Sequence, residues 1–317
     1  MFNVGLIYRA SLCFCLILIS MLLTSWENLE YDDKDFEQLG RKLFYDTQLS
    51  YSNKISCSHC HEPTLAFTDG YRISHNEKAI LLHKNSPTLL NIDQRLHFNW
   101  SSKSITSLSE QIKGPLFNNH PDEMGFYRDT AIIMKRLDHD PVYETDLKNL
   151  KHKTFDRYLI ISALSAYIKK LTSRNSKYDH FKSSQDSTIF TNKEWQGYKV
   201  FMSEEAKCNF CHGGQDFFTP KFGVEFITEK KGVDIRIPTL RNVAITAPYF
   251  HDGREDSLLK AIQEHITITS EKDPRYHAIH LEDAKIKTII SFLHTLTDTT
   301  YLTNPYFNNP FIAKNRS

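Results

Sequence analysis

The amino-acid sequence predicts a mainly α-helical protein built from two similar domains, and three observations support this fold class. The chain has 317 residues, enough for two domains of roughly 100 to 200 residues each. One cysteine-containing pentapeptide and its surroundings occur twice along the chain. Apolar residues recur at helical spacing, whereas runs with the alternation of a β-strand are few and short.

The composition is that of an ordinary soluble globular protein, with 40% hydrophobic and 24% charged residues. The chain carries 39 Lys and Arg against 38 Asp and Glu, a net charge of +1. Nucleic-acid binding relies on an excess of basic residues that neutralises phosphates. We therefore expect no nucleic-acid partner.

An apolar, uncharged segment at residues 11–23 follows Arg9 and precedes Thr24 and Ser25, which is the layout of a secretory signal. The segment is shorter than the ~20 residues that cross a bilayer. We therefore predict that residues 1–25 are a signal peptide and that the protein is exported to the periplasm. An uncleaved membrane anchor and a buried core helix are the alternatives.

Two of the six cysteines lie in this leader, and the other four form two Cys-x-x-Cys-His pentapeptides, Cys57-Ser-His-Cys60-His61 and Cys208-Asn-Phe-Cys211-His212. A histidine directly after each Cys-x-x-Cys is typical of covalent c-type haem attachment. On a helical turn, positions i, i+3 and i+4 share a face, so both thiols can bond one haem while the histidine is aimed at its iron. The sequence thus predicts two haem c groups.

Two other uses of paired cysteines are weaker alternatives. A zinc site made of two Cys-x-x-Cys knuckles normally spaces them by ~15 to 20 residues, whereas Cys57 and Cys208 are 151 positions apart. A thioredoxin-like redox pair explains neither the duplication nor the histidines.

The surroundings of the two pentapeptides also repeat. Residues 37–44 and 194–201 share the pattern Glu-x-x-Gly-x-Lys-x-Phe upstream of each pentapeptide, and Phe67-Thr68 corresponds to Phe218-Thr219 downstream. Further on, Pro-Thr-Leu-x-Asn occurs at 87–91 and again at 238–242. Two copies of one cytochrome c-like module explain these matches.

Helix signals set the predicted boundaries. Thr191 and Glu194 form a capping box that opens an apolar series at Trp195, Tyr198 and Met202, and we expect this helix to run into the second pentapeptide. A second helix is predicted at 154–171, from the apolar spacing of Tyr158, Ile161, Leu164 and Ile168. With the break between 173 and 190, the predicted domains are 30–175 and 185–310, each cored by one haem.

The sequence resembles the bacterial dihaem cytochrome c peroxidase family and the related MauG-type enzymes, which mature methylamine dehydrogenase. Besides both pentapeptides, the resemblance rests on residues 39–46, 66–70, 85–91, 107–111, 121–125, 238–244 and 247–253. It implies that peroxide reacts at the N-terminal haem, whose proximal ligand is His61. It also implies that the C-terminal haem, with proximal ligand His212, collects electrons from a small donor protein, a cytochrome c or a cupredoxin.

The resemblance assigns three candidate catalytic residues. Glu123, in Pro-Asp-Glu-Met-Gly, matches the acid/base carboxylate that moves a proton between the two peroxide oxygens; the alternative is a solvated loop glutamate. Gln111 would line the same pocket. Trp100 matches the tryptophan between the haems, an electron relay, and the alternative is a buried core residue. Ser101 to Lys103 replace the usual Asp-Gly-Arg.

The resemblance also assigns further metal ligands. His75 resembles the removable sixth ligand of the peroxidatic haem, although His83 is nearby. A calcium ion that bridges the two domains would be bound by Asn85, Thr246 and Pro248, because hard oxygen ligands suit calcium.

The sixth ligand of the second haem departs from the family pattern. Relatives place methionine, or tyrosine in the MauG-type enzymes, 14 residues after the histidine that matches His251; here that position is His265. The chain has no methionine beyond Met202, so methionine ligation from this segment is excluded. We predict bis-histidine ligation, with a helix-face histidine as the alternative.

The resulting prediction is an exported dihaem peroxidase that reduces hydrogen peroxide to water. A MauG-like oxidase that uses a high-valent haem state is the first alternative, and a non-catalytic dihaem electron carrier is the second. The sequence leaves open whether the leader anchors the protein to a membrane and whether the protein is a homodimer.

Overall fold

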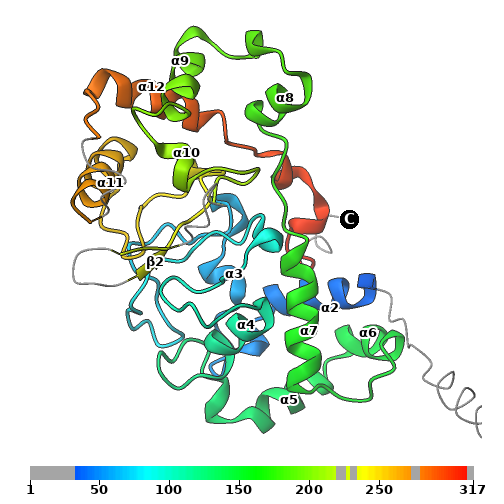
Figure 1. Cartoon of the computed structure of the whole chain (residues 1–317). Helices are drawn as coiled ribbons and strands as arrows, with labels where there is room; N and C mark the ends of the chain where they lie inside the picture. The colour runs from blue at the N-terminus through cyan, green and yellow to red at the C-terminus, as the bar shows by residue number, and fades with distance from the viewer. Residues whose placement is uncertain (1–32, 219–225, 229–233, 273–278, 313–317) are drawn as a thin grey trace, which may run out of the picture. The chain divides into compact units, whose positions relative to one another are not determined.

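The computed structural model describes residues 33–218, 226–228, 234–272 and 279–312. For 226–228 and 268–272 only the backbone is described. The predicted leader at 1–25 lies outside these ranges. Among the described residues no helix is long and apolar enough to cross a membrane. The described chain is mainly helical, as predicted, with little strand (Figure 1).

The helices are α2 (Asp33–Tyr45), α3 (Cys57–Cys60), α4 (Leu108–Phe117), α5 (Thr130–Asp138), α6 (Glu144–Asn149), α7 (Arg157–Lys169), α8 (Lys177–Ser184), α9 (Asn192–Phe201), α10 (Cys208–Cys211), α11 (Leu258–Lys272) and α12 (Asp283–His294). Strands β1 (Phe226–Thr228) and β2 (Asp234–Arg236) pair antiparallel, with Ile227 opposite Ile235. Long loops and short 3-10 turns connect these elements.

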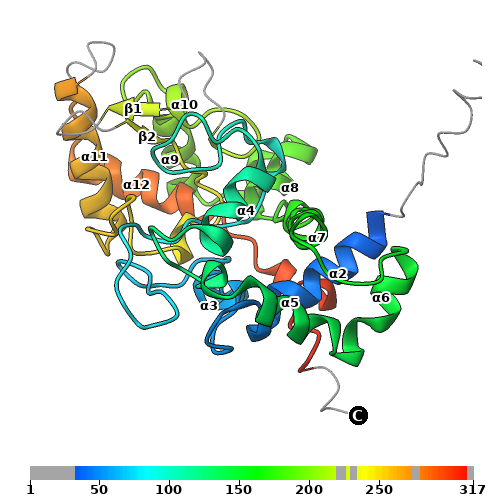
Figure 2. The ribbon, with the colours of Figure 1, turned by 90° about the horizontal axis from the view of Figure 1, so that it is seen from below.

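The sequence repeat recurs in three dimensions as two crossing helix pairs, α2 with α7 and α9 with α12 (Figures 1 and 2). Each crossing has a glycine at its closest point. A Cβ atom on Gly40 would lie 1.8 Å from the Ala163 carbonyl oxygen, and one on Gly197 would lie 1.9 Å from the Thr288 carbonyl oxygen. Only glycine permits such close approach of two backbones. The repeated glycine of the sequence therefore sets the packing of both halves.

The C-terminal half has an aromatic core. Phe201 of α9 and Phe292 of α12 pack with their ring centroids 5.2 Å apart, and Tyr178 and Phe181 of α8 belong to the same buried cluster. Helix α8 lies inside the predicted break at 173–190. The core of the second half therefore begins before residue 185.

Two details of the predicted helices were wrong. Helix α9 ends at Phe201, with Met202 as its C-cap, and does not run into the second pentapeptide. A separate helix, α10, starts at Cys208 after its N-cap Lys207, which has a left-handed φ of 51°. The capping box of Thr191 and Glu194 is confirmed. In α7, Tyr158 is 73% exposed rather than buried. It lies in the first turn, two residues after the N-cap Asp156, and burial of the helix begins at Leu159.

The C-terminal tail crosses back to the first half. Phe307 packs edge-on against Phe67, 6.4 Å between ring centroids, and its carbonyl oxygen accepts a hydrogen bond from the Tyr45 hydroxyl. Arg41 of α2 donates to the carbonyl oxygen of Asn308. Residues 301–308, which the sequence assigned to the second module, thus help to close the core of the first.

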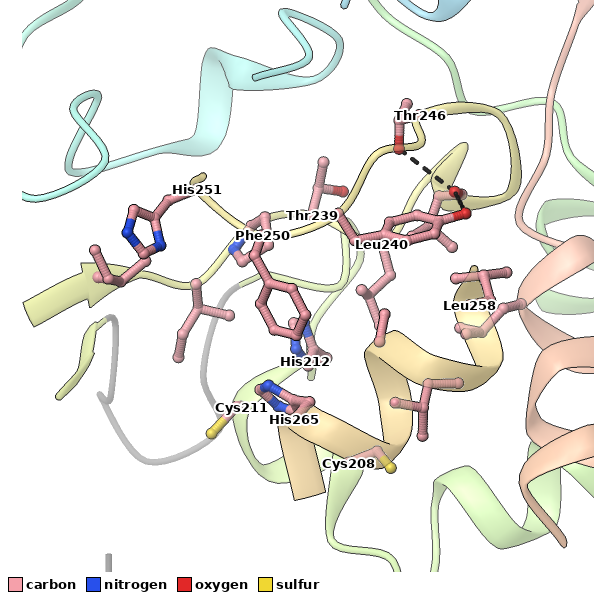
Figure 3. Close-up of a pocket in the computed structure, with 18 of the residues that line it drawn as sticks. Cys208, Cys211, His212, Thr239, Leu240, Thr246, Phe250, His251, Leu258 and His265 are labelled. Atoms are coloured by element: carbon pink, nitrogen blue, oxygen red, sulfur yellow. Dashed lines mark hydrogen bonds between the residues drawn. The ribbon is translucent and has the colours of Figure 1, made fainter. Parts of the chain in front are cut away.

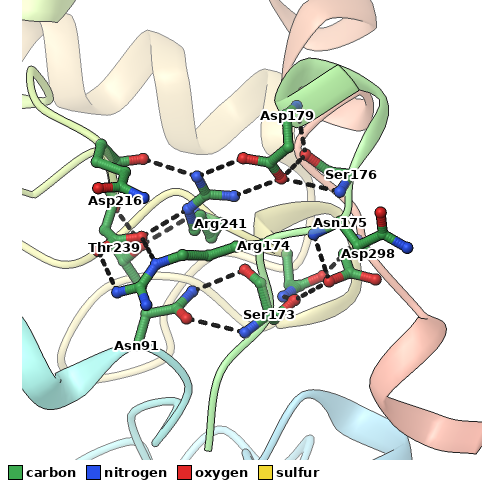
Figure 4. A network of polar contacts seen from close by, with 12 residues as sticks. Asn91, Ser173, Arg174, Asn175, Ser176, Asp179, Asp216, Thr239, Arg241 and Asp298 are labelled. Carbon is green, nitrogen blue, oxygen red and sulfur yellow. Dashed lines mark hydrogen bonds and ion pairs between the residues drawn. The ribbon is translucent and has the colours of Figure 1, made fainter. Parts of the chain in front are cut away.

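The second repeated motif, Pro-Thr-Leu-x-Asn, ties both halves to the segment between them (Figure 4). Asn91 and Asn242 have left-handed φ values of 56° and 59°, which asparagine tolerates better than most residues. Both side chains are fully buried and bind Ser173: Asn91 through the serine backbone, and Asn242 through the serine hydroxyl at 2.8 Å. The asparagine is repeated because each copy holds the same connecting segment.

Candidate functional site

The first cavity has a volume of about 410 Å³ and contains Cys57, Cys60 and His61 in its lining. Helix α3 carries both thiols on one short turn, and His61 follows as its C-terminal cap. The His61 Nδ1–H group donates to the Phe67 carbonyl oxygen at 2.9 Å. Because a carbonyl can only accept, Nδ1 carries the proton and Nε2 keeps its lone pair for a metal. Burial lowers the pKa of His61, which favours this neutral form.

The second cavity, about 220 Å³, repeats this arrangement with Cys208, Cys211 and His212. The His212 Nδ1–H group donates to the Phe217 carbonyl oxygen at 3.0 Å. Burial, with a smaller contribution from the neighbouring His265, lowers the pKa of His212 to about 4. This imidazole is therefore neutral and available as a ligand at physiological pH.

The structure also corrects one match within the repeat. The sequence aligned Phe67 with Phe218, but the residue that accepts from the haem-motif histidine in the second half is Phe217. Phe67 and Phe217 share left-handed φ values of 59° and 54°. The loop after His212 is therefore one residue shorter than the loop after His61, which an ungapped comparison misses.

His265 of α11 faces His212 across the second cavity (Figure 3). Their ring centroids are 6.1 Å apart. Two imidazoles that bind one metal ion from opposite sides, at metal–nitrogen distances of about 2.0 to 2.1 Å, have ring centres about 6 Å apart. The spacing of the two rings fits one metal ion between them.

Glu123 lines the first cavity together with His61. Its backbone is held by the Glu77 N–H group, which donates to the Glu123 carbonyl oxygen at 3.0 Å. Gly125, with a φ of 68°, makes the turn next to it, and a Cβ there would lie 2.7 Å from a Glu77 carboxylate oxygen. These contacts explain why the Pro-Asp-Glu-Met-Gly motif ends in glycine.

The acidic residues around Glu123 are neutralised by an arginine, but Glu123 itself is not. Arg128 forms ion pairs with both neighbouring acids, Glu77 and Asp122. The Glu123 carboxylate has no hydrogen bond or ion pair to any of the described residues. Desolvation by burial raises its pKa to about 7. A carboxyl group with this pKa can take up and release a proton near neutral pH.

Gln111 and His75 line the same cavity as Glu123. The Gln111 Oε1 atom accepts a hydrogen bond from Asn99 Nδ2 at 3.2 Å, which orients the amide. The His75 ring packs edge-on against Tyr71, with centroids 5.4 Å apart. His83 also lies in the lining. The fold thus brings together polar side chains that are far apart in the sequence.

Trp100 lies in the wall that the two cavities share, since it lines both. Its indole Nε1–H donates to the Asn85 carbonyl oxygen at 2.9 Å. The guanidinium of Arg236 lies over its ring, 5.2 Å from the centroid. Although Ser101 to Lys103 replace the usual Asp-Gly-Arg, Trp100 is held by both its hydrogen bond to Asn85 and its contact with Arg236.

The three predicted calcium ligands, Asn85, Thr246 and Pro248, all line the second cavity. The Asn85 side-chain amide donates to the Tyr71 carbonyl oxygen at 2.8 Å. In the described part of the chain, no three His, Cys, Asp or Glu side chains cluster so as to hold a metal ion directly. The two Cys-x-x-Cys pairs therefore do not converge on a zinc site.

Sequence reasoning missed two residues of the shared wall. Arg95 and Arg236 line both cavities and are 8% and 5% exposed. Arg236 Nη1 and Arg95 Nε are buried without hydrogen-bond partners. No sequence pattern marks them, because their placement depends on the contact between segments more than 130 residues apart.

The donor sets fit two covalently bound haems. Each cavity offers two cysteine thiols on one helical turn, a neutral histidine with a free Nε2 lone pair, and, in its wall, two arginines that each have one buried nitrogen without a hydrogen-bond partner. A mainly α fold that carries two such sites defines a c-type dihaem protein.

Comparisons with known proteins agree with this class. A family model described as di-haem cytochrome c peroxidase matches residues 34–187. The cytochrome c551 peroxidase of Nitrosomonas europaea is 29% identical over 84% of this chain and 81% of its own length. The methylamine utilization protein MauG of Methylorubrum extorquens is 26% identical over 81% of this chain and 77% of its own.

Among solved structures, a MauG-like protein associated with microbial copper homeostasis superimposes with a TM-score of 0.80 and 26% identity. The match covers 90% of this chain and 99% of that one. In sequence and in fold the chain matches the dihaem cytochrome c peroxidase and MauG family.

Proposed function

We propose that this protein is a dihaem peroxidase that reduces hydrogen peroxide to water with electrons from a small redox protein. The observation that carries the proposal is the Glu123 carboxylate, which lies in the cavity of His61 without a protein partner and has a pKa of about 7. A pure electron carrier has no need of such a group. An acid/base catalyst of peroxide cleavage requires one.

The haem held by Cys57, Cys60 and His61 would supply peroxide binding and electron transfer. Glu123 would accept the proton of the nearer peroxide oxygen and return it to the departing oxygen, which leaves as water. Gln111, fixed by Asn99, would offer its amide N–H group to the bound peroxide. Two electrons and two protons complete the conversion of one peroxide to two water molecules.

The two cavities differ in a way that supports a division of labour. The larger first cavity has no second histidine stacked opposite His61 among its described ring contacts, whereas His265 faces His212 in the smaller second cavity. We propose that His212 and His265 are both axial ligands there. Two fixed ligands suit electron transfer, since little rearranges when the iron changes charge. Trp100 would carry electrons between the haems.

The remaining predictions belong to the same proposal. The protein would work in the periplasm, where a cytochrome c or a cupredoxin supplies electrons. His75 would be a removable ligand of the first haem, and Asn85, Thr246 and Pro248 would bind calcium between the halves. The net charge of +1 gives little long-range attraction, so the donor would dock on a local patch.

A MauG-like oxidase is the second candidate. The matches to MauG and to a MauG-like structure favour it, as does the lack of methionine after Met202. In that case the oxidising equivalents taken from peroxide would act on another protein or on a small substrate.

Stopped-flow mixing of the half-reduced protein with peroxide, with and without a reduced cytochrome c, separates the candidates. A peroxidase oxidises the cytochrome catalytically, and the Glu123→Gln variant loses this turnover. The matched control is Glu110→Gln, an exposed glutamate paired with Lys113 on α4, which should turn over like the wild type. A long-lived oxidised state of the protein that does not react with the reduced cytochrome would favour the oxidase.

A further inference from the structure

Arg95 and Arg236 are two buried cations that the proposed reaction does not use. Arg95 follows the turn at Ile92–Gln94, and Arg236 ends strand β2. Both line the first and the second cavity. They therefore occupy the wall between the two haem sites, where Trp100 also lies.

Neither arginine has a carboxylate partner among the described residues. Arg236 donates through Nε to the Asn99 carbonyl oxygen at 3.1 Å, but its Nη1 is buried without a partner. The Arg95 guanidinium lies over the Phe218 ring, 4.5 Å from the centroid, and its Nε is likewise unpartnered. Arg241 shows the contrast: it is just as buried and pairs with Asp216 and Asp179.

A buried guanidinium without a counter-ion is strongly unfavourable, and arginine remains protonated at any physiological pH. Burial lowers the pKa of Arg236 only to about 10. Anions bound in the cavities would neutralise these two buried cations. A planar carboxylate matches the guanidinium fork best, because it accepts two parallel hydrogen bonds.

We propose that Arg95 and Arg236 form one anion subsite, shared by both cavities, that binds the carboxylate side chains of the two haems. The inference rests on the two-haem assignment made above. Each haem carries two carboxylates, four in all, so each of the two arginines would bind one of them; ligand and site match in the sign of their charges and in location, because both arginines line both cavities. Free anions from solvent would have to reach the same buried groups past the haems.

The subsite also reaches the proposed electron relay. The backbone N–H of Arg236 donates to the Trp100 carbonyl oxygen at 2.8 Å, and its side chain covers the indole ring. An arginine that binds haem carboxylates therefore also fixes the position of Trp100. Both haems and the tryptophan would share one charged contact.

The test uses the purified dihaem protein and three variants: Arg236→Gln, Arg95→Gln and Arg236→Lys. Removing a cation beside a haem favours the ferric form, which carries the extra positive charge. We expect Arg236→Gln to shift the reduction equilibrium of at least one haem about tenfold toward the ferric form, a fall of about 59 mV for one electron. Spectroelectrochemical titration measures this shift, and a haem assay confirms that two haems are bound.

The matched control is Arg157→Gln. Arg157 also lies over an aromatic ring, Phe117, at 4.8 Å, but it is solvent-exposed. Its removal should leave both potentials unchanged. Potentials of Arg236→Gln and Arg95→Gln that equal the wild type, at full haem content, would overturn the proposal.

Arg236→Lys decides the question if the glutamine variants do not incorporate haem. Lysine keeps the charge but loses the fork, so the resonance Raman band of haem carboxylate bending should shift; an unchanged band overturns the proposal. These readouts do not depend on peroxide turnover. If the protein is inactive with peroxide but the potentials shift, the proposed function fails and the anion subsite is supported. If the protein is active but the potentials of the variants are unchanged, only the anion subsite is contradicted.

Discussion

The imidazole rings of His212 and His265 face each other across the second cavity with centroids 6.1 Å apart. One comes from the segment after α10 and the other from α11. Their separation was not given by any local pattern, although counting 14 residues from His251 had pointed to His265. The relationship leads to the first prediction.

Replacing His265 by alanine should convert the second haem from low-spin to high-spin in the ferric protein, because one of two strong ligands is removed. His265→Met should restore a low-spin haem and raise its potential, since methionine ligation does so. Electron paramagnetic resonance and near-infrared absorption check both changes. His294→Ala, an exposed histidine at the end of α12, is the control. Unchanged low-spin signals in His265→Ala would refute bis-histidine ligation.

The peroxide reaction should depend on pH through Glu123. Burial raises its pKa to about 7, and the deprotonated carboxylate is the form that accepts the peroxide proton. Below pH 7 the rate should therefore fall about tenfold per pH unit, and above pH 7 it should level off. Glu123→Gln should react about 10²- to 10⁴-fold more slowly, and its rate should not fall with decreasing pH below pH 7. If the rate of the variant still falls below pH 7, the titrating group is not Glu123.

Gly197→Ala should destabilise the second half, because its new Cβ would lie 1.9 Å from the Thr288 carbonyl oxygen. Overpacking of this kind costs about 1 to 3 kcal/mol or more of unfolding free energy. The control is Gly114→Ala within α4, where the nearest atom to the new Cβ, apart from the chain neighbours, is 3.7 Å away. The ring of the following Pro115 crowds this Cβ and offsets the gain in helix propensity, so we expect a clearly smaller effect than at Gly197. Denaturant unfolding of both variants checks the difference.

Trp100→Leu should slow electron transfer between the haems while both haem spectra stay native. Leucine removes the indole ring from the shared wall and the N–H donor to the Asn85 carbonyl oxygen. The rate of re-reduction of the first haem after one peroxide turnover, followed by stopped flow, measures the effect. Trp195→Leu, a tryptophan of the aromatic cluster around α9, is the control for loss of a packed indole. Equal rates in Trp100→Leu and wild type would rule out a relay role.

Several features were predicted from the sequence because they depend on local geometry. The Cys-x-x-Cys-His turns, the capping box of Thr191 and Glu194 and the repeated glycines reflect the chemistry of a few neighbouring residues. Glu123 was named as the candidate acid/base group from the family resemblance of its Pro-Asp-Glu-Met-Gly motif. The predicted continuation of α9 into the second pentapeptide was wrong, since α9 ends at Phe201 and α10 begins separately after Lys207.

The sequence by itself determined the two Cys-x-x-Cys-His turns and the mainly helical fold, because spacing along the chain controls which side chains share a helical turn. The candidate carboxylate Glu123 came from the family resemblance and not from spacing. Only the tertiary structure decided that Arg95 and Arg236 meet at one wall and that the tail at Phe307 closes the first core. It also decided that Glu123 and His61 line the same cavity, with no hydrogen bond or ion pair to the Glu123 carboxylate from the described residues. These relationships join segments far apart in the chain, where burial and long-range packing, and not local periodicity, determine which groups meet.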